Sequence, residues 1–189
     1  MKKIISVNNL NLYKNQRLKI GFLGGSFDPP HHGHLHIALN ALEELKLDEV
    51  WLSVAKQNPF KENHKYSFNE RLRLTEKLIE GHANLKVLSI EDELNILYTI
   101  EIIEHLTMQL SNIEFYFIIG ADLSASIHTW GGYEKIIDLA KLVIFSRSGY
   151  SHEVEGSQII QEYKNSGKVS FISIDEIDIS STEIRNKTK

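Results

Sequence analysis

The chain has 189 residues, of which 42% are hydrophobic, a formal net charge of −4 and no cysteine. This length suits one domain with a sizeable core, the negative charge disfavours a nucleic-acid binder, and the lack of cysteine excludes disulfides and suits a reducing compartment. No segment is apolar enough for a membrane span or a signal peptide. We therefore expect a cytoplasmic protein that binds no nucleic acid and no membrane.

The first half of the chain alternates strand and helix patterns. Residues 1–17 precede the first predicted strand and are interpreted as an N-terminal extension, followed by a single domain over 18–189. The apolar run 18–23 predicts a buried strand. The segment after Gly33 predicts a helix, a strand is predicted at 49–55, and a polar loop follows at 56–66. Ser67 and Glu70 have the spacing of a capping box and predict the start of the next helix.

The second half continues the alternation. Strands are predicted at 85–90, 114–119, 142–145 and 168–173, a helix carries an apolar stripe from Ile100 to Leu110, and residues 148–167 are interpreted as a mobile surface segment. Strictly alternating elements predict an α/β fold with a doubly wound, Rossmann-like parallel sheet and helices on both faces. Ligands of such sheets bind beyond the carboxyl ends of the strands.

The most informative segment is residues 24–34, Gly-Gly-Ser-Phe-Asp-Pro-Pro-His-His-Gly-His, which directly follows the first predicted strand. Gly24 and Gly25 permit backbone angles that a side chain forbids, so that peptide N–H groups can approach an anion. The helix that follows adds N–H donors and a partial positive charge at its N-terminus. This segment predicts a site for a polyphosphate.

Two histidines in this segment are candidates for chemistry. His31 and His34 are three residues apart at the loop-to-helix junction, so both imidazoles can point into one crevice. Donors that are already in place when a phosphoryl oxygen gains charge contribute about 3–4 kcal/mol each. A zinc cluster with His32 and His36 is the structural alternative, together with a merely polar helix start. Zinc is disfavoured because four histidines within six positions cannot converge on one tetrahedron, and we interpret His32 and His36 as surface residues.

A second motif lies near the C-terminus, where Ile179 is followed by Ser180, Ser181, Thr182 and, three residues later, Arg185. The hydroxyl groups suit the start of a short helix, and a guanidinium one turn later can lie beside phosphates. By itself this pattern is an ordinary capped helix. Together with the glycine loop it supplies the opposite wall of a triphosphate site.

Taken together, these motifs resemble those of the nucleotidyltransferase superfamily that shares the HxGH pattern, here residues 31–34. Residues 58–61, 98–99, 118–122, 129–130 and 142–147 are similar, in order and spacing, to the bacterial nicotinate-nucleotide adenylyltransferases. The resemblance covers residues 18–187. It implies transfer of the adenylyl group of ATP to nicotinic acid mononucleotide, a step of NAD biosynthesis, with Mg²⁺ carried by ATP and with no tightly bound cofactor or metal site on the protein.

The resemblance also implies roles for individual residues. Catalysis is assigned to His31, His34 and Arg185. ATP binding is assigned to Gly24, Gly25, Ser26, Phe27, His31, His34, Gly120, Asp122, Ile179, Ser180, Ser181, Thr182 and Arg185, and mononucleotide binding to Lys61, Thr99, Trp130 and Arg147. Many relatives carry Pro-Pro-His-Lys where this chain has Asn-Pro-Phe-Lys at 58–61, which leaves Lys61 as the main polar contact of that loop.

Chemistry alone leaves other roles open for these residues. Asp122 and Thr99 also suit helix caps, Trp130 also suits a core position, and Lys61 and Arg147 also suit a solvated surface. Alternative functions are adenylyl transfer to nicotinamide mononucleotide or phosphopantetheine, cytidylyl transfer to a sugar or alcohol phosphate, a nucleotide-binding regulator without catalysis, and RNA binding. The sequence predicts no oligomeric state.

Overall fold

A computed structural model of the chain describes residues 3–56, 64–147, 158–163 and 165–174. Its centre is a sheet of seven parallel strands in the order β1-β4-β3-β2-β5-β6-β7. The strands are β1 Ile4–Ile5, β2 Lys19–Gly25, β3 Glu49–Val54, β4 Leu85–Leu88, β5 Glu114–Gly120, β6 Lys141–Arg147 and β7 Val169–Ile174.

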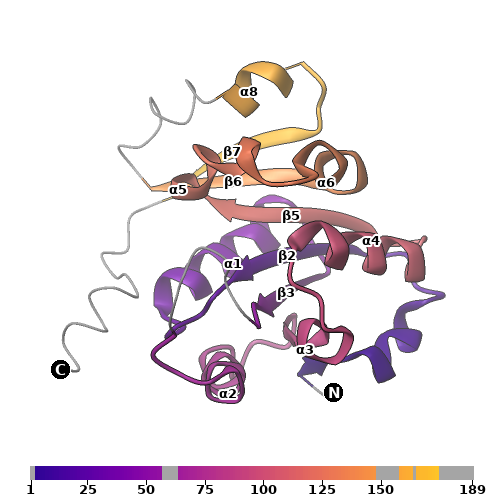
Figure 1. The fold of residues 1–189 in the computed structure, drawn as a ribbon, viewed down its shortest axis with the longest axis vertical. Coiled ribbons are helices and arrows are strands. Elements are labelled where there is room, and N and C mark those ends of the chain that lie inside the picture. The colour runs from indigo at the N-terminus through magenta and orange to yellow at the C-terminus, as the bar shows by residue number, and fades with distance from the viewer. Residues whose placement is uncertain (1–2, 57–63, 148–157, 164, 175–189) are drawn as a thin grey trace.

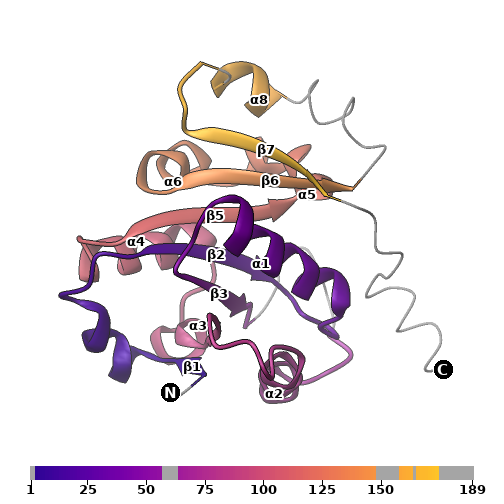
Figure 2. The same cartoon turned by 180° about the vertical axis from the view of Figure 1, so that it is seen from behind.

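Helices cover both faces of the sheet (Figures 1 and 2). One face carries α1 His32–Glu44 and α2 Phe68–Leu78. The other face carries η1 Val7–Tyr13, α3 Ile90–Leu94, α4 Thr99–Gln109, α6 Tyr133–Leu139 and α8 Gln158–Tyr163, with the short turns α5 Ala121–Ser124 and η2 Ile127–Thr129 between β5 and α6. The predicted doubly wound, Rossmann-like parallel α/β fold is confirmed.

Alternation along the strands divides the core into two layers. In β5, Phe115, Phe117 and Ile119 pack in the layer beneath α4 and α6, whereas Tyr116 and Ile118 pack in the layer beneath α1. Successive side chains of a strand point to opposite faces, so a strand that is buried on both sides is apolar throughout. This explains why these strands appear in the sequence as continuous apolar runs.

The N-terminal residues differ from their interpretation as a segment that precedes the first strand. Ile4–Ile5 forms the edge strand β1, in which Ile4 pairs with Val87 and Ile5 with Leu88. Leu10 and Tyr13 of η1 are buried in the same core layer as α4. The expectation that 18–23 is the first strand is therefore wrong, because a two-residue strand shows no periodicity and exists only through its pairing with β4.

Other boundaries differ by a few residues. The helix expected after Gly33 begins at His32, and the strand expected over 85–90 ends at Leu88, where Ile90 begins α3. Within the expected mobile surface segment, Gln158–Tyr163 forms α8, and Ile159 is fully buried against the core; residues 148–157 lie outside the described residues. In the described ranges, no helix combines the length and the apolar character needed to cross a bilayer.

Candidate nucleotide-binding site

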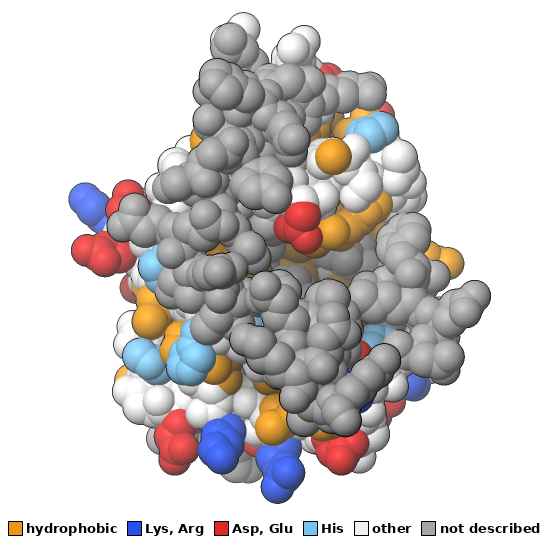
Figure 3. Space-filling model, turned by 90° about the vertical axis from the view of Figure 1, so that its left-hand side faces the viewer, with side chains coloured by type: hydrophobic (Ala, Val, Ile, Leu, Met, Phe, Trp, Pro, Cys, Tyr) orange, Lys and Arg blue, Asp and Glu red, His pale blue; other side chains and the backbone are white. Residues whose placement is uncertain are grey.

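The site lies where the strand order reverses. From β2 the chain proceeds to β3 and β4 on one side and then returns to β5 on the other side of β2. Ligands of open α/β sheets bind beyond the carboxyl ends of the strands at such a switch point. In Figure 1 the strand arrows point to the left, so Figure 3 looks onto this edge, where histidine side chains gather among the described residues. The predicted motifs at 24–34 and 120–122 thus leave two neighbouring strands.

The two glycines of the loop end strand β2, and the expectation that they adopt unusual backbone angles is wrong. Gly24 and Gly25 belong to β2 and pair in register with Ser53 and Val54 of β3. The left-handed conformation falls on Phe27, with φ of 46°. A Cβ at Gly25 would lie 3.2 Å from the Phe27 ring, which folds back and is buried. The glycine therefore makes room for the ring at the turn.

The two candidate histidines hold each other at the start of α1. His31 is the N-cap, and its Nδ1 accepts the Gly33 N–H at 3.1 Å, while Nδ1 of His34 accepts the His31 N–H at 3.2 Å. The ring centroids of His31 and His34 are 3.8 Å apart, and the His34 ring lies 4.7 Å from that of Phe27. An imidazole whose Nδ1 accepts a hydrogen bond carries its proton on Nε2 when neutral. Both rings are therefore set in the tautomer that makes Nε2 a donor.

The other histidines of the segment have separate surroundings. His32 is exposed, whereas His36 is half-buried and within hydrogen-bond distance of Asn40 one turn along α1. The surface interpretation is confirmed for His32, whereas His36 is only partly exposed. Within the described ranges, no three histidine, aspartate or glutamate side chains gather as metal ligands.

The end of β5 supplies the second wall. Gly120 is the N-cap of α5, so the alternative role of Asp122 as that cap is wrong; Asp122 lies in the first turn and is exposed. A Cβ at Gly120 would lie 2.5 Å from Oδ1 of Asp122. The glycine therefore leaves space for this carboxylate at the edge of the sheet. A carboxylate in this position can accept hydrogen bonds from sugar hydroxyls.

Thr99 and Trp130 lie in segments that contact each other. Thr99 is the first residue of α4, whose cap is Tyr98, so the alternative role of Thr99 as a cap is wrong. A Cβ at Gly132 would lie 3.2 Å from Ile100, which places the loop after Trp130 against the start of α4. The Trp130 ring lies 6.4 Å from that of Phe117, and the side chain is half-buried. Trp130 thus packs partly on the core and keeps part of its surface accessible.

Several predicted residues cannot be placed in the same way. Lys61, Ile179, Ser180, Ser181, Thr182 and Arg185 lie outside the described residues, and for Arg147 the structure describes the backbone only, as the end of β6 opposite Ile174.

The sequence analysis missed a buried charged cluster beneath the loop. Asp28, Arg71 and Glu91 are each at most 5% exposed. Burial lowers the pKa of Arg71, while the charges of Asp28 and Glu91 act in the opposite direction. Burial raises the pKa of Glu91 to about 7, against the lowering effects of hydrogen bonds from the Lys56 N–H and the Ser53 hydroxyl and of the charge of Arg71. One signal was available, because Arg71 lies on the same helical stripe as Phe68, Leu72 and Thr75, where an apolar residue is expected.

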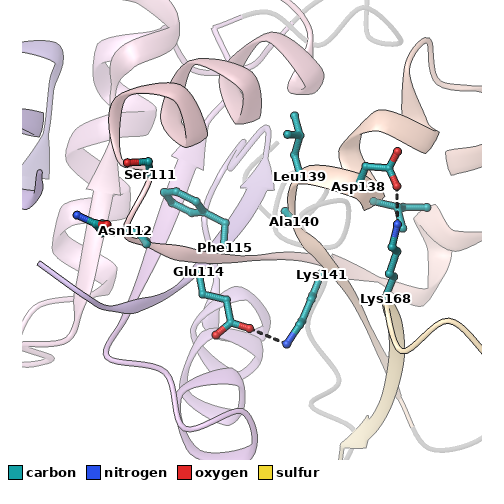
Figure 4. Close-up of a pocket in the computed structure, with 11 residues that line it drawn as sticks. Ser111, Asn112, Glu114, Phe115, Asp138, Leu139, Ala140, Lys141 and Lys168 are labelled. Atoms are coloured by element: carbon teal, nitrogen blue, oxygen red, sulfur yellow. Dashed lines mark hydrogen bonds and ion pairs between the residues drawn. The ribbon is translucent and has the colours of Figure 1, made fainter.

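A hollow also exists at the opposite edge of the sheet (Figure 4). It is lined by residues at the amino ends of β5 and β6, among them Glu114 and Lys141, which form an ion pair at 2.6 Å. Asp138 and Lys168 form a second ion pair at 2.6 Å. Because these charges neutralise each other far from the switch point, the hollow does not belong to the nucleotide-binding site.

The comparisons with known proteins agree with this geometry. The sequence profile of the cytidylyltransferase-like family matches residues 22–187, and the chain belongs to this family. Within it, the chain groups with the nicotinate-nucleotide adenylyltransferases. It is 35% identical to the probable nicotinate-nucleotide adenylyltransferase of Pelagibacter ubique, over 94% of this chain and 96% of that protein. It is 38% identical to the probable nicotinate-nucleotide adenylyltransferase of Clostridium tetani, over 90% of this chain and 87% of that protein. The nicotinic acid mononucleotide adenylyltransferase of Plasmodium falciparum complexed with NaAD has the same fold, with a TM-score of 0.72, 22% identity, and coverage of 89% of this chain and 83% of that one.

Proposed function

We propose that the protein transfers the adenylyl group of Mg-ATP to nicotinic acid mononucleotide, giving nicotinic acid adenine dinucleotide and pyrophosphate. The observation that carries this proposal is the pair His31 and His34, whose Nδ1 atoms accept backbone N–H groups and whose Nε2 atoms are consequently donors at the switch point. The names of the relatives from Pelagibacter ubique and Clostridium tetani support the same activity.

The reaction needs positioning and charge stabilisation rather than an activated side chain. A phosphate oxygen of the mononucleotide attacks the α-phosphorus of ATP in line, and the bond from that phosphorus to the oxygen shared with the β-phosphorus breaks. The attacking phosphate is already ionised at neutral pH, so no general base is required. The Nε2–H groups of His31 and His34 donate to α-phosphoryl oxygens, where preorganised donors act most strongly in the transition state.

The remaining residues divide between the two substrates. Gly24, Gly25, Ser26 and Phe27 present backbone to ATP, Gly120 and Asp122 contact its ribose, and the motif Ile179, Ser180, Ser181, Thr182 and Arg185 holds the β- and γ-phosphates. Trp130 stacks on the pyridine ring, Thr99 lies at its carboxylate, and Lys61 and Arg147 contact the mononucleotide phosphate. Mg²⁺ would enter as part of the ATP substrate, where it would neutralise phosphate charge.

The proposal is tested by pyrophosphate release from Mg-ATP with nicotinic acid mononucleotide and, in parallel, with nicotinamide mononucleotide. We expect rapid release with the acid and much slower release with the amide. Equal rates would contradict the selectivity for the acid. Release with neither, together with release on addition of phosphopantetheine, would overturn the choice of acceptor and leave adenylyl transfer in place.

A further inference from the structure

The buried guanidinium of Arg71 connects three segments at the carboxyl edge of the sheet. Its Nη1 donates to the carbonyl oxygens of Ser26 at 2.7 Å and Ala55 at 2.6 Å, its Nη2 to that of Lys56 at 3.0 Å, and its Nε to that of Tyr66 at 3.3 Å. These carbonyl groups belong to the loop after β2, the end of β3 and the approach to α2. The planar fork of an arginine can serve several acceptors in fixed directions, which an ammonium group on a flexible stem cannot do.

The two carboxylates of the cluster, Asp28 and Glu91, accept hydrogen bonds from the same segments. Asp28 accepts the N–H groups of Lys65 at 2.9 Å and Tyr66 at 3.0 Å. Glu91 accepts the N–H of Lys56 at 2.8 Å and the hydroxyl of Ser53 at 3.2 Å. Lys56 and Tyr66 are thus each fixed twice, at the carbonyl group by Arg71 and at the N–H group by a carboxylate.

This arrangement ties Lys56 and Tyr66 to the histidine loop. Asp28 lies within that loop, three residues before His31, and Ser26 lies one residue before Phe27, whose ring contacts His34. Lys61, which the proposed function assigns to the mononucleotide, lies between Lys56 and Tyr66 in the sequence. A shift of Lys56 or Tyr66 relative to the histidine loop is therefore expected to affect the acceptor more than ATP.

We propose that Arg71, held between Asp28 and Glu91, is a positioning residue for adenylyl transfer, which fixes Ala55, Lys56 and Tyr66 to the loop that carries His31 and His34. A buried arginine with this hydrogen bonding costs stability to desolvate, and an apolar side chain at this place on α2 would serve packing alone. Its four hydrogen bonds to carbonyl groups offset this cost and order the residues that carry them. This inference deepens the proposed function and rests on it for the identity of the acceptor.

The test compares Arg71→Lys with Arg73→Lys, a matched control on the exposed side of the same helix. In Arg71→Lys we expect kcat/KM for the mononucleotide to fall by about 10- to 100-fold, as misplacement of a reacting group by about 1 Å does, whereas the KM for ATP changes by less than about threefold and Arg73→Lys behaves as the wild type. Amide hydrogen exchange is measured in the same proteins, and we expect the protection of Lys65 and Tyr66 to fall by about tenfold while that of the central strands is unchanged.

The two readouts separate this inference from the proposed function. A wild-type protein that releases no pyrophosphate would overturn the proposed function, and hydrogen exchange would still decide whether Arg71 orders Lys65 and Tyr66. Unchanged protection of Lys65 and Tyr66 in Arg71→Lys would overturn the inference. Reduced protection with an unchanged kcat/KM for the mononucleotide would also overturn it, since Arg71 would then be structural only. If Arg71→Lys does not fold, Asp28→Asn is used instead, because it removes the carboxylate that accepts the Lys65 and Tyr66 N–H groups. It must lower both the protection of these two amides and kcat/KM for the mononucleotide.

Discussion

Substitutions of His34 can distinguish the hydrogen bond that its Nδ1 accepts from the catalytic role proposed for its Nε2. Nδ1 of His34 accepts the His31 N–H at 3.2 Å, whereas the proposed catalytic donor is Nε2 on the other side of the ring. An asparagine side chain can replace Nδ1 as the acceptor but offers nothing at the position of Nε2. A glutamine side chain reaches the position of Nε2 with an N–H donor but does not restore the bond to the backbone. Alanine removes both.

We expect His34→Asn to lower kcat by about 10²- to 10³-fold, the loss typical of one preorganised donor, with a Tm close to that of the wild type. His34→Ala loses as much activity and in addition about 1 kcal/mol of capping energy, which for a chain of this length lowers Tm by about 2–4 °C. His34→Gln keeps part of the activity of the wild type and loses the capping energy.

The assay is pyrophosphate release at saturating substrates, combined with thermal unfolding of each variant. His32→Ala is the control, because His32 is exposed in the first turn of the same helix, and we expect it to retain wild-type kcat. Near-normal turnover of His34→Asn would refute the assignment of Nε2. A loss in His32→Ala as large as that in His34→Ala would show that any change at this helix start disables the protein.

Three further predictions follow from the packing and charge of the site. Burial raises the pKa of Glu91 from 4.5 to about 7, so between these pH values the native state keeps a proton that the unfolded chain releases. The free energy of unfolding should therefore fall by up to about 3 kcal/mol as the pH rises through this interval. Glu91→Gln should remove this dependence in denaturant titrations at pH 5 and pH 8, and an unchanged dependence would contradict the raised pKa. Gly132→Ala should lose about 1–2 kcal/mol in the same titrations at neutral pH, because Gly132 has φ of 80° and an added Cβ meets Ile100 at 3.2 Å, whereas Gly131→Ala, with nothing within 4 Å, should lose much less. Trp130→Leu keeps an apolar contact in the core and should raise the KM for the mononucleotide by about tenfold, equivalent to about 1.4 kcal/mol of lost stacking, without changing the KM for ATP. An unchanged KM for the mononucleotide would place Trp130 outside acceptor recognition.

The features that the sequence determined by itself are those encoded in neighbouring residues. The apolar runs at β2, β5 and β6 and the capping box at Ser67 predicted their elements to within a few residues, because strand and helix periods and cap chemistry are local. The same alternation predicted the parallel sheet. The motif at 31–34 predicted two imidazoles at one helix start, and both lie there with their rings in contact.

Tertiary structure alone decided what depends on residues far apart in the chain. Strand β1 exists because Ile4 and Ile5 pair with β4, more than eighty residues away, and two residues carry no detectable period. The left-handed conformation of Phe27 brings its ring so close to Gly25 that a Cβ there would lie 3.2 Å from it, a contact that the sequence does not reveal. Arg71 is buried because carbonyl groups from three separate segments converge on it. Hydrogen bonds between distant segments leave no periodic trace in the sequence, so the fold and the chemical groups of the site could be predicted, whereas the side chains that position those groups became visible only in three dimensions.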